Sequence, residues 1–252
     1  MGLARKVLWI VNMNTDASEK SFAKHALACA ADTVCIQTSS NRLPDAISDF
    51  KKLGMSVYAW RWPSSIPTRA MAEANMVAKK LIPAGLDGYI ADPESDGPGA
   101  NDWNKPGLEQ LAADFCATIK DGTGKNFRFG VTSGCSYPAP NMKPHIPWKQ
   151  FFSASDILLP QCYWRWTSPA TGKPGKINGG TPAKAIAKGV PAWKAKSLGK
   201  PVVPMAGEID VVLPDEIKEY GQALEASGVM EGHFYADTGD IPVANLAAIQ
   251  AL

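Results

Sequence analysis

The chain has 252 residues, of which 45% are hydrophobic and 20% are charged, and its formal net charge is only +2. This balance is typical of an ordinary globular protein and argues against extensive disorder. The small net charge argues against nucleic acid or an anionic membrane surface as the main partner.

Short apolar runs alternate with longer amphipathic stretches along the whole sequence, which predicts repeated strand–helix units and a parallel sheet. Strands are predicted over residues 6–13, 33–38, 55–62, 86–92, 127–133, 157–163, 201–206 and 232–236. Helices are predicted over residues 18–31, 44–53, 67–82, 105–120, 148–153, 182–198, 214–227 and 242–252. Eight such units without a linker predict one α/β domain over residues 1–252, folded as a single (β/α)8 TIM barrel. The first strand also lacks the G-x-G-x-x-G turn of a dinucleotide-binding sheet.

The cysteines and histidines give no sign of a metal site. The five cysteines are irregularly spaced without a C-x-x-C pair, which favours buried free thiols over disulfides or zinc. His25, His145 and His233 are predicted on a helix, in a loop and at a strand start, so they form no cluster for a transition metal. We therefore expect no resident metal and no cofactor.

No apolar run is long enough for a signal peptide or a membrane span. The expectation is a monomer made in the cytoplasm, without a membrane partner and without nucleic acid. Release by cell lysis or by a non-classical export route would then bring it to an extracellular substrate.

Barrel enzymes place their chemistry on the loops that follow the strands. The longest predicted loops of this kind cover residues 95–104, 134–147 and 165–181. Six of the eight tryptophans lie at or near these strand ends: Trp60, Trp62, Trp103, Trp148, Trp164 and Trp166. Flat apolar rings around a cleft suit the faces of sugar rings, which indicates a carbohydrate site. The alternative is that the rings pack over the end of the barrel.

The most informative segment is L-D-G-Y-I-A-D-P-E, residues 86–94. Because side chains alternate along a strand, Ile90, Asp92 and Glu94 share one face, and the two carboxylates are expected at the top of the barrel. Two carboxylates held there repel, so at least one pKa should rise and that group can donate a proton. The other can stabilise a cation, act as a nucleophile or orient the substrate. The alternatives are a structural pair bound to basic groups, or a magnesium-assisted enzyme of central metabolism.

Other strand ends carry polar or aromatic side chains that would complete such a site. The residues expected to bind substrate are Asn12, Asn14, Trp60, Arg61, Gln161, Tyr163, Trp164, Glu208, Tyr235 and Asp237. Gln37 and Ser133 also fall at strand ends.

The segment D-G-Y-I-A-D-P-E resembles the strand-four motif of family 25 glycoside hydrolases (lysozyme-type muramidases) and of family 18 chitinases. Gly207-Glu208 and Tyr235-Ala236-Asp237 are similar to the ends of strands seven and eight in bacterial and phage proteins with a family 25-like domain. The resemblance implies a glycosidase barrel for an amino-sugar polymer, with peptidoglycan as the expected substrate. Glu94 would be the general acid, and Asp92 would stabilise charge or orient a 2-acetamido group.

The chain departs from both families at defined positions. Asn12 and Asn14 stand where family 25 enzymes usually end strand one with Asp. Family 18 enzymes need an Asp at the position of Ile90 and a Tyr-Asp pair where this chain has Tyr163-Trp164. These departures support the alternative function, a non-catalytic glycan-binding or scaffold barrel of a phage particle or secretion machine.

Overall fold

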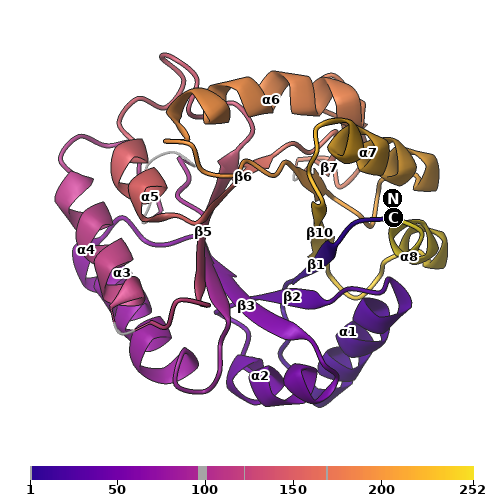
Figure 1. The fold of residues 1–252 in the computed structure, drawn as a ribbon, viewed down its shortest axis with the longest axis horizontal. Helices are drawn as coiled ribbons and strands as arrows, with labels where there is room; N and C mark the ends of the chain where they lie inside the picture. The colour runs from indigo at the N-terminus through magenta and orange to yellow at the C-terminus, as the bar shows by residue number, and fades with distance from the viewer. Residues whose placement is uncertain (1, 96–100, 122, 169) are drawn as a thin grey trace.

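The computed structural model describes residues 2–95, 101–121, 123–168 and 170–252. Eight parallel strands surround a central axis and helices surround the strands, which confirms the predicted (β/α)8 barrel (Figure 1). The barrel strands are β1 (Arg5–Ile10), β2 (Thr33–Gln37), β3 (Ser56–Arg61), β4 (Gly88–Ala91), β5 (Arg128–Gly134), β6 (Ile157–Gln161), β9 (Met205–Gly207) and β10 (Glu231–Asp237). The helices are α1 (Asp16–Ala28), α2 (Leu43–Lys52), α3 (Pro67–Met76), α4 (Glu109–Lys120), α5 (Trp148–Ala154), α6 (Pro182–Lys196), α7 (Pro214–Ala226) and α8 (Val243–Gln250).

The strands pair in the order β6-β5-β4-β3-β2-β1-β10-β9. The barrel closes between β6 and the segment that leads into β9, through a parallel bridge between Leu158 and Val202. The Leu158 amide donates to the Pro201 carbonyl over 2.9 Å, and the Val203 amide donates to the Leu158 carbonyl over 2.8 Å. The seventh strand is therefore shorter than predicted, because its first half contributes only this bridge.

Alternation along the strands builds two apolar layers. One layer fills the barrel interior and includes Trp9, Trp60 and Ile90, with the two indole rings 5.5 Å apart. The other layer lies between the strands and the helices and includes Tyr89 and Ala91. Ile90 faces the interior, as the sequence predicts, so the next positions of the same parity point to the top of the barrel.

Two segments differ from the predicted elements. The third helix ends in a π-helical turn, η1 (Val77–Leu81), and the fourth helix begins at Glu109, four residues later than predicted. The loop after β6 forms an antiparallel hairpin of β7 (Arg165–Thr167) and β8 (Pro174–Lys176). Each hairpin strand has only three residues and no apolar alternation, so its sequence carries no strand pattern.

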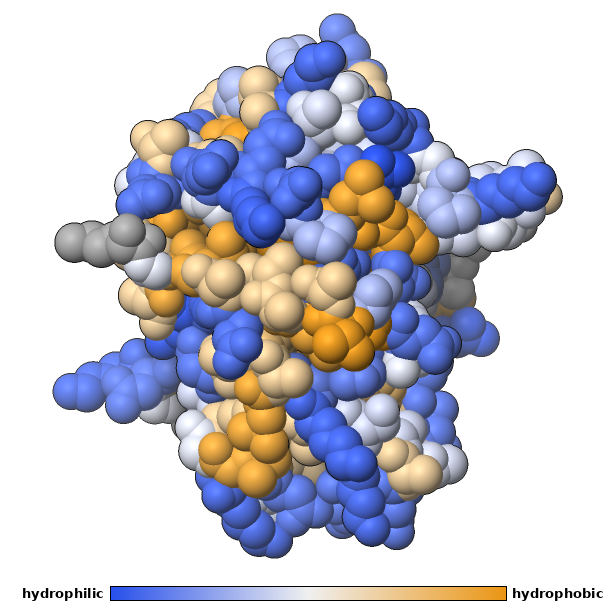
Figure 2. Space-filling view, turned by 90° about the vertical axis from the view of Figure 1, so that its right-hand side faces the viewer, coloured by the Kyte–Doolittle hydropathy of each residue, from blue (hydrophilic) through white to orange (hydrophobic). Residues whose placement is uncertain are grey.

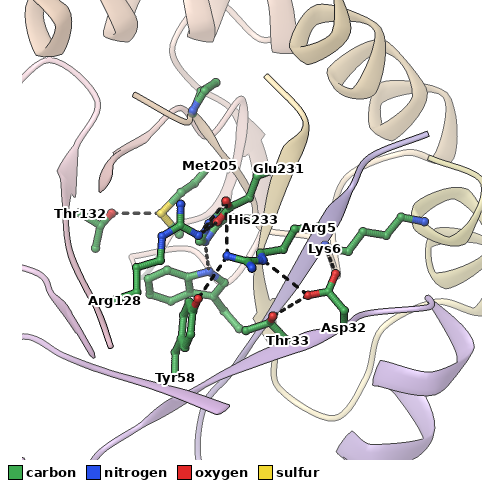
Figure 3. A network of polar contacts seen from close by, with 12 residues as sticks. Arg5, Lys6, Asp32, Thr33, Tyr58, Arg128, Thr132, Met205, Glu231 and His233 are labelled. Carbon is green, nitrogen blue, oxygen red and sulfur yellow. Dashed lines mark hydrogen bonds and ion pairs between the residues drawn. The ribbon is translucent and has the colours of Figure 1, made fainter. Parts of the chain in front are cut away.

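The amino end of the barrel carries a network of polar side chains. Figure 3 shows Arg5, Tyr58, Arg128, Glu231 and His233 pointing toward one another from four strands. His233 is fully buried, and Glu231 accepts hydrogen bonds from Arg128 and His233.

The face that carries α8 and the chain termini is turned to the viewer in Figure 2, where apolar residues lie across its middle among polar ones. Val243 of α8 is 81% exposed. Within the described residues, no helix has the length and apolar character that crossing a membrane requires.

Candidate functional site

A cavity of about 560 Å³ opens at the carboxyl end of the barrel strands. The strand-end residues in its lining are Asp92, Glu94, Gln161, Tyr163, Glu208 and Tyr235, all of which the sequence predicts for the site. A larger hollow of about 780 Å³ lies at the opposite end, around Arg5 and Arg128. Its carboxylate, Glu231, is already held by ion pairs, so the smaller cavity is the better candidate for chemistry.

The two strand-four carboxylates are held on a fixed backbone. The Asp92 amide donates to the Arg61 carbonyl over 2.9 Å, and the Glu94 carbonyl accepts from the Trp103 amide over 2.9 Å. The Ser133 hydroxyl donates to the Pro93 carbonyl between them over 2.7 Å. Asp92 is 3% exposed and Glu94 is 7% exposed, so both side chains reach the cavity from a largely buried position.

Gln161 orients the first of these carboxylates. Its Nε2 donates to Oδ1 of Asp92 over 3.0 Å, across the top of the barrel from the end of β6. An amide donor stabilises the carboxylate form and restricts its rotation. Asp92 is thereby presented to the cavity in a defined orientation.

Two stacked tyrosines line the same cavity. The rings of Tyr163 and Tyr235 stack with centroids 5.4 Å apart and planes 12° from parallel. Burial raises the pKa of both phenols well above the ordinary value, and the nearby carboxylates Asp92, Glu94 and Glu208 raise it further. Both hydroxyls therefore stay protonated near neutral pH and can donate hydrogen bonds to a ligand.

Glu208 brings a third carboxyl group to the cavity from the end of β9. Its Oε2 accepts from the Thr167 amide of the hairpin over 2.9 Å, and burial raises its pKa. The preceding Gly207 allows close packing here, because a Cβ atom at this position would lie 2.6 Å from the Tyr163 ring. The peptide bonds Gly207–Glu208 and Tyr235–Ala236 are cis.

Only two of the six strand-end tryptophans line the cavity. Trp62 and Trp166 are each 38% exposed, one from the end of β3 and one from the hairpin. The alternation of side chains along a strand could have predicted Trp62 for the cavity, because Trp62 lies two positions beyond the inward-facing Trp60. Trp166 depends on the hairpin, which the sequence does not reveal.

Trp60 and Trp164 do not line the cavity, in contrast to the expectation. Trp60 is fully buried in the barrel interior, with its ring 5.5 Å from that of Trp62. Trp164 is fully buried on the outer side of the barrel, where its Nε1 donates to Glu216 of α7 over 3.1 Å. Tyr163 faces inward, so its neighbour in sequence faces outward.

Asp237 is also outside the cavity lining. It is fully buried, and it binds the His25 ring over 2.8 Å and the Gly239 amide over 2.8 Å. The register between β1 and β10 shifts just before Asp237, and a strand irregularity of this kind redirects a side chain.

Three further expected residues, Asn12, Asn14 and Arg61, lie outside the cavity lining. Asn12 and Asn14 are exposed in the loop after β1, where Asn14 accepts a hydrogen bond from the Asn41 amide. Arg61 is half-buried, and its charge lowers the pKa of Glu73 on α3 against the larger raising effect of burial. None of the three is among the cavity-lining residues.

Among the described residues, no three His, Cys, Asp or Glu side chains gather in a way that would hold a metal ion. All five cysteines are free and buried.

The fold resembles solved glycoside hydrolases, although sequence comparison finds nothing. No protein-family model matches the chain, and no curated protein matches its sequence. The spore cortex-lytic enzyme SleL of Bacillus cereus superposes with a TM-score of 0.66 at 9% identity, over 97% of this chain and 74% of that one. A GH18 chitinase from Pseudoalteromonas aurantia gives a TM-score of 0.63 at 12% identity, over 98% of both chains.

The catalytic domain of β-amylase from Paenibacillus polymyxa also superposes, with a TM-score of 0.63 at 7% identity, over 98% of this chain and 97% of that one. At such identities the likeness defines the class of fold, a TIM-type barrel of the kind found in these enzymes, and not the reaction. The GH18 chitinase has the fold of one of the two families that strand four resembles; the family 25 resemblance stays a prediction.

Proposed function

We propose that the protein is a glycoside hydrolase that acts on an amino-sugar polymer, with Glu94 as the general acid. The observation that carries the proposal is the pair of nearly buried carboxylates at the end of β4, which line one cavity together with two stacked tyrosines. The position on the carboxyl face of the barrel supports it, because TIM-barrel enzymes place their chemistry there.

In the proposed reaction, Glu94 donates a proton to the glycosidic oxygen as the bond from that oxygen to the anomeric carbon breaks. The electron pair of the bond stays on the leaving oxygen, and positive charge develops at the anomeric carbon. Asp92, oriented by Gln161, stabilises this charge or holds the 2-acetamido group of the sugar. The ionised Glu94 then takes a proton from the water that completes hydrolysis.

The proposed substrate is an amino-sugar polymer, with peptidoglycan first and chitin second. The names of SleL, as a cortex-lytic enzyme, and of the GH18 chitinase support this class. The exposed faces of Trp62 and Trp166 would pack against sugar rings, and the Tyr163 and Tyr235 hydroxyls would donate to acetamido or hydroxyl oxygens.

One observation favours a second candidate, a non-catalytic glycan-binding barrel. Ile90 stands at the position of the middle Asp in the family 18 pattern, and it is fully buried among apolar side chains of the interior. Asp92 therefore has no carboxyl neighbour two positions earlier in the strand with which to share a proton. A barrel that binds glycans without cleaving them would retain the cavity and tolerate this change.

The test is release of reducing ends from peptidoglycan and from chitin oligosaccharides by wild type, Glu94→Gln and Glu109→Gln. Glu109 is exposed on α4, so this variant makes the same chemical change away from the cavity. We expect wild type and Glu109→Gln to release reducing ends and Glu94→Gln to be slower by at least about 100-fold, the usual minimum for a lost general acid.

Calorimetric binding of the same oligosaccharides separates the two candidates. Binding by the wild type without any release of reducing ends would support the glycan-binding barrel and refute the hydrolase. Neither binding nor release, with the barrel folded by circular dichroism, would refute both.

A further inference from the structure

Two cysteines lie side by side at the edge of the cavity. Cys135 follows β5 and Cys162 follows β6, and the register of these paired strands aligns Gly134 with Gln161 immediately before them. The two sulfur atoms are 3.8 Å apart. Adjacent strands run about 4.8 Å apart, within the Cα separation that a disulfide spans, so little backbone movement is needed to join the sulfurs.

The surrounding structure makes room for both sulfurs. A Cβ atom on Gly189 of α6 would lie 2.5 Å from the Cys135 sulfur and 2.8 Å from the Cys162 sulfur. Any other residue at position 189 would therefore displace the pair. The Cys135 backbone is fixed by the Trp193 indole N–H, which donates to its carbonyl over 3.0 Å.

The two thiols differ in access and in acidity. Cys135 is 6% exposed and lines the cavity, whereas Cys162 is fully buried behind it. The hydrogen bond between the two thiols lowers the pKa of Cys135, and Lys188 lowers it further, against the effect of burial. Burial raises the pKa of Cys162 well above its ordinary value. The more acidic thiol, which lines the cavity, thus lies next to a fully buried one.

The other cysteines lack these features. Burial raises the pKa of Cys29 to about 11 and that of Cys116 to about 12, and it also raises the pKa of Cys35. None of the three lines the cavity. Since the thiolate is the reactive form, they are expected to be inert.

We propose that Cys135 and Cys162 form an oxidisable dithiol, which hydrogen peroxide entering through the cavity converts to a disulfide between the ends of β5 and β6. The Cys135 thiolate attacks one peroxide oxygen, the O–O bond breaks, and the leaving hydroxide takes up the proton that Cys135 has lost and becomes water, so that Cys135 becomes a sulfenic acid. The Cys162 sulfur then attacks the Cys135 sulfur, the S–O bond breaks, and the released hydroxide takes up the Cys162 proton as water. In total, two thiols and one peroxide give one disulfide and two waters.

The test counts thiols in the reduced, folded protein before and after treatment with hydrogen peroxide, using a chromogenic disulfide reagent in denaturant, followed by peptide mapping. We expect the five thiols of the wild type to fall to three and to return with dithiothreitol. The mapping should recover one linked peptide pair that joins Cys135 to Cys162. Cys116→Ser, which changes a buried cysteine on α4, should still lose two thiols.

The variants Cys135→Ser and Cys162→Ser should form no intramolecular disulfide under the same treatment. Peptide mapping of the wild type requires neither variant, so the test holds if one of them fails to fold. Retention of all five thiols, or a linked pair that involves other cysteines, would overturn the proposal. None of these measurements uses glycan cleavage, so they are independent of the proposed function.

Discussion

Replacing Glu231 with Gln is expected to lower the stability of the barrel in a pH-dependent way. Both oxygens of Glu231 accept from Nη1 of Arg128 over 2.7 Å, and Oε1 also accepts from Nε2 of His233 over 2.8 Å. Burial alone would raise the pKa of Glu231, but these partners outweigh it and lower the pKa to about 2. Relative to the ordinary value of 4.5, this difference corresponds to about 3 kcal/mol at about 1.36 kcal/mol per pH unit.

Because His233 is neutral, it stabilises the Glu231 carboxylate slightly less than a charged imidazolium would. Burial lowers the pKa of His233, and its Nδ1 accepts from the Trp9 indole N–H over 3.0 Å, so the ring is neutral and donates to Glu231 only through Nε2–H. It therefore contributes a hydrogen bond and not a full charge. We take the stabilisation from the Glu231 ion pair and hydrogen bonds as roughly 2–3 kcal/mol at neutral pH.

The directions of the two pKa shifts determine how the stability changes with pH. Glu231 has a folded pKa below its ordinary value of 4.5, so its contribution is present above that pH and is lost as the pH falls toward 2. His233 has a folded pKa below its ordinary value of 6.5, so below that pH the unfolded chain takes up a proton that the folded chain does not. Both groups make the protein less stable in acid.

The assay is urea unfolding at pH 7, 5 and 3, followed by tryptophan fluorescence, for wild type, Glu231→Gln and the exposed control Glu109→Gln. At pH 7 we expect the free energy of unfolding to be roughly 2–3 kcal/mol lower for Glu231→Gln than for wild type, and lower by about 0.5 kcal/mol or less for the control. The difference in the free energy of unfolding between wild type and Glu231→Gln should be smaller by about half at pH 3. A gap of equal size at pH 7 and pH 3 would refute the assignment of the low pKa to Glu231.

Three further changes test the packing and the cavity. Gly189→Ala should lower the free energy of unfolding by roughly 1–3 kcal/mol, because the added methyl group would clash with the two cysteine sulfurs. Ala normally stabilises a helix, so an unchanged or higher free energy of unfolding in urea would contradict this prediction. Arg165→Met should cost about 1–3 kcal/mol in the same assay, because Arg165 Nε and Nη2 donate to Glu216 over 2.7–3.0 Å and thereby anchor the hairpin. Trp166→Ala should weaken calorimetric binding of chitin oligosaccharides by roughly tenfold with little change in stability, since its ring is 38% exposed; unchanged affinity would exclude this ring from the site.

The fold could be predicted because its causes are local. Most barrel strands are short apolar runs buried on both faces. Helix entries such as Thr181-Pro182 follow known capping rules, with Thr181 accepting from the Lys184 amide. The strand-four pair could also be predicted from a local cause. Side chains two positions apart share a face of a strand, so Asp92 and Glu94 point to the same side as the inward-facing Ile90.

The missed features depend on contacts between distant parts of the chain. The β7–β8 hairpin is held by Arg165 against Glu216, 51 positions away, and nothing in its own residues predicts two strands. Asp237 has the residue type of a site carboxylate, but an irregular strand register and His25 of α1 hold it outside the cavity. The sequence also does not show how deep in the barrel a side chain lies. Trp60 and Trp62 are on the same face of the strand, but Trp60 is buried in the core, whereas Trp62 lies higher along the barrel axis and lines the cavity.

Two buried carboxyl groups at opposite ends of the barrel, Glu231 and Glu208, have pKa values shifted in opposite directions. At the amino end, Arg128 and His233 hold Glu231 ionised, with its pKa lowered to about 2. At the carboxyl end, burial raises the pKa of Glu208, Tyr163 and Tyr235, and the nearby carboxylates raise the pKa of the two tyrosines further. A group that must keep a proton near neutral pH and then give it up needs the second environment. Glu208 shows that the carboxyl end of the barrel offers this environment, which supports the proposal that Glu94 of the same cavity donates the proton.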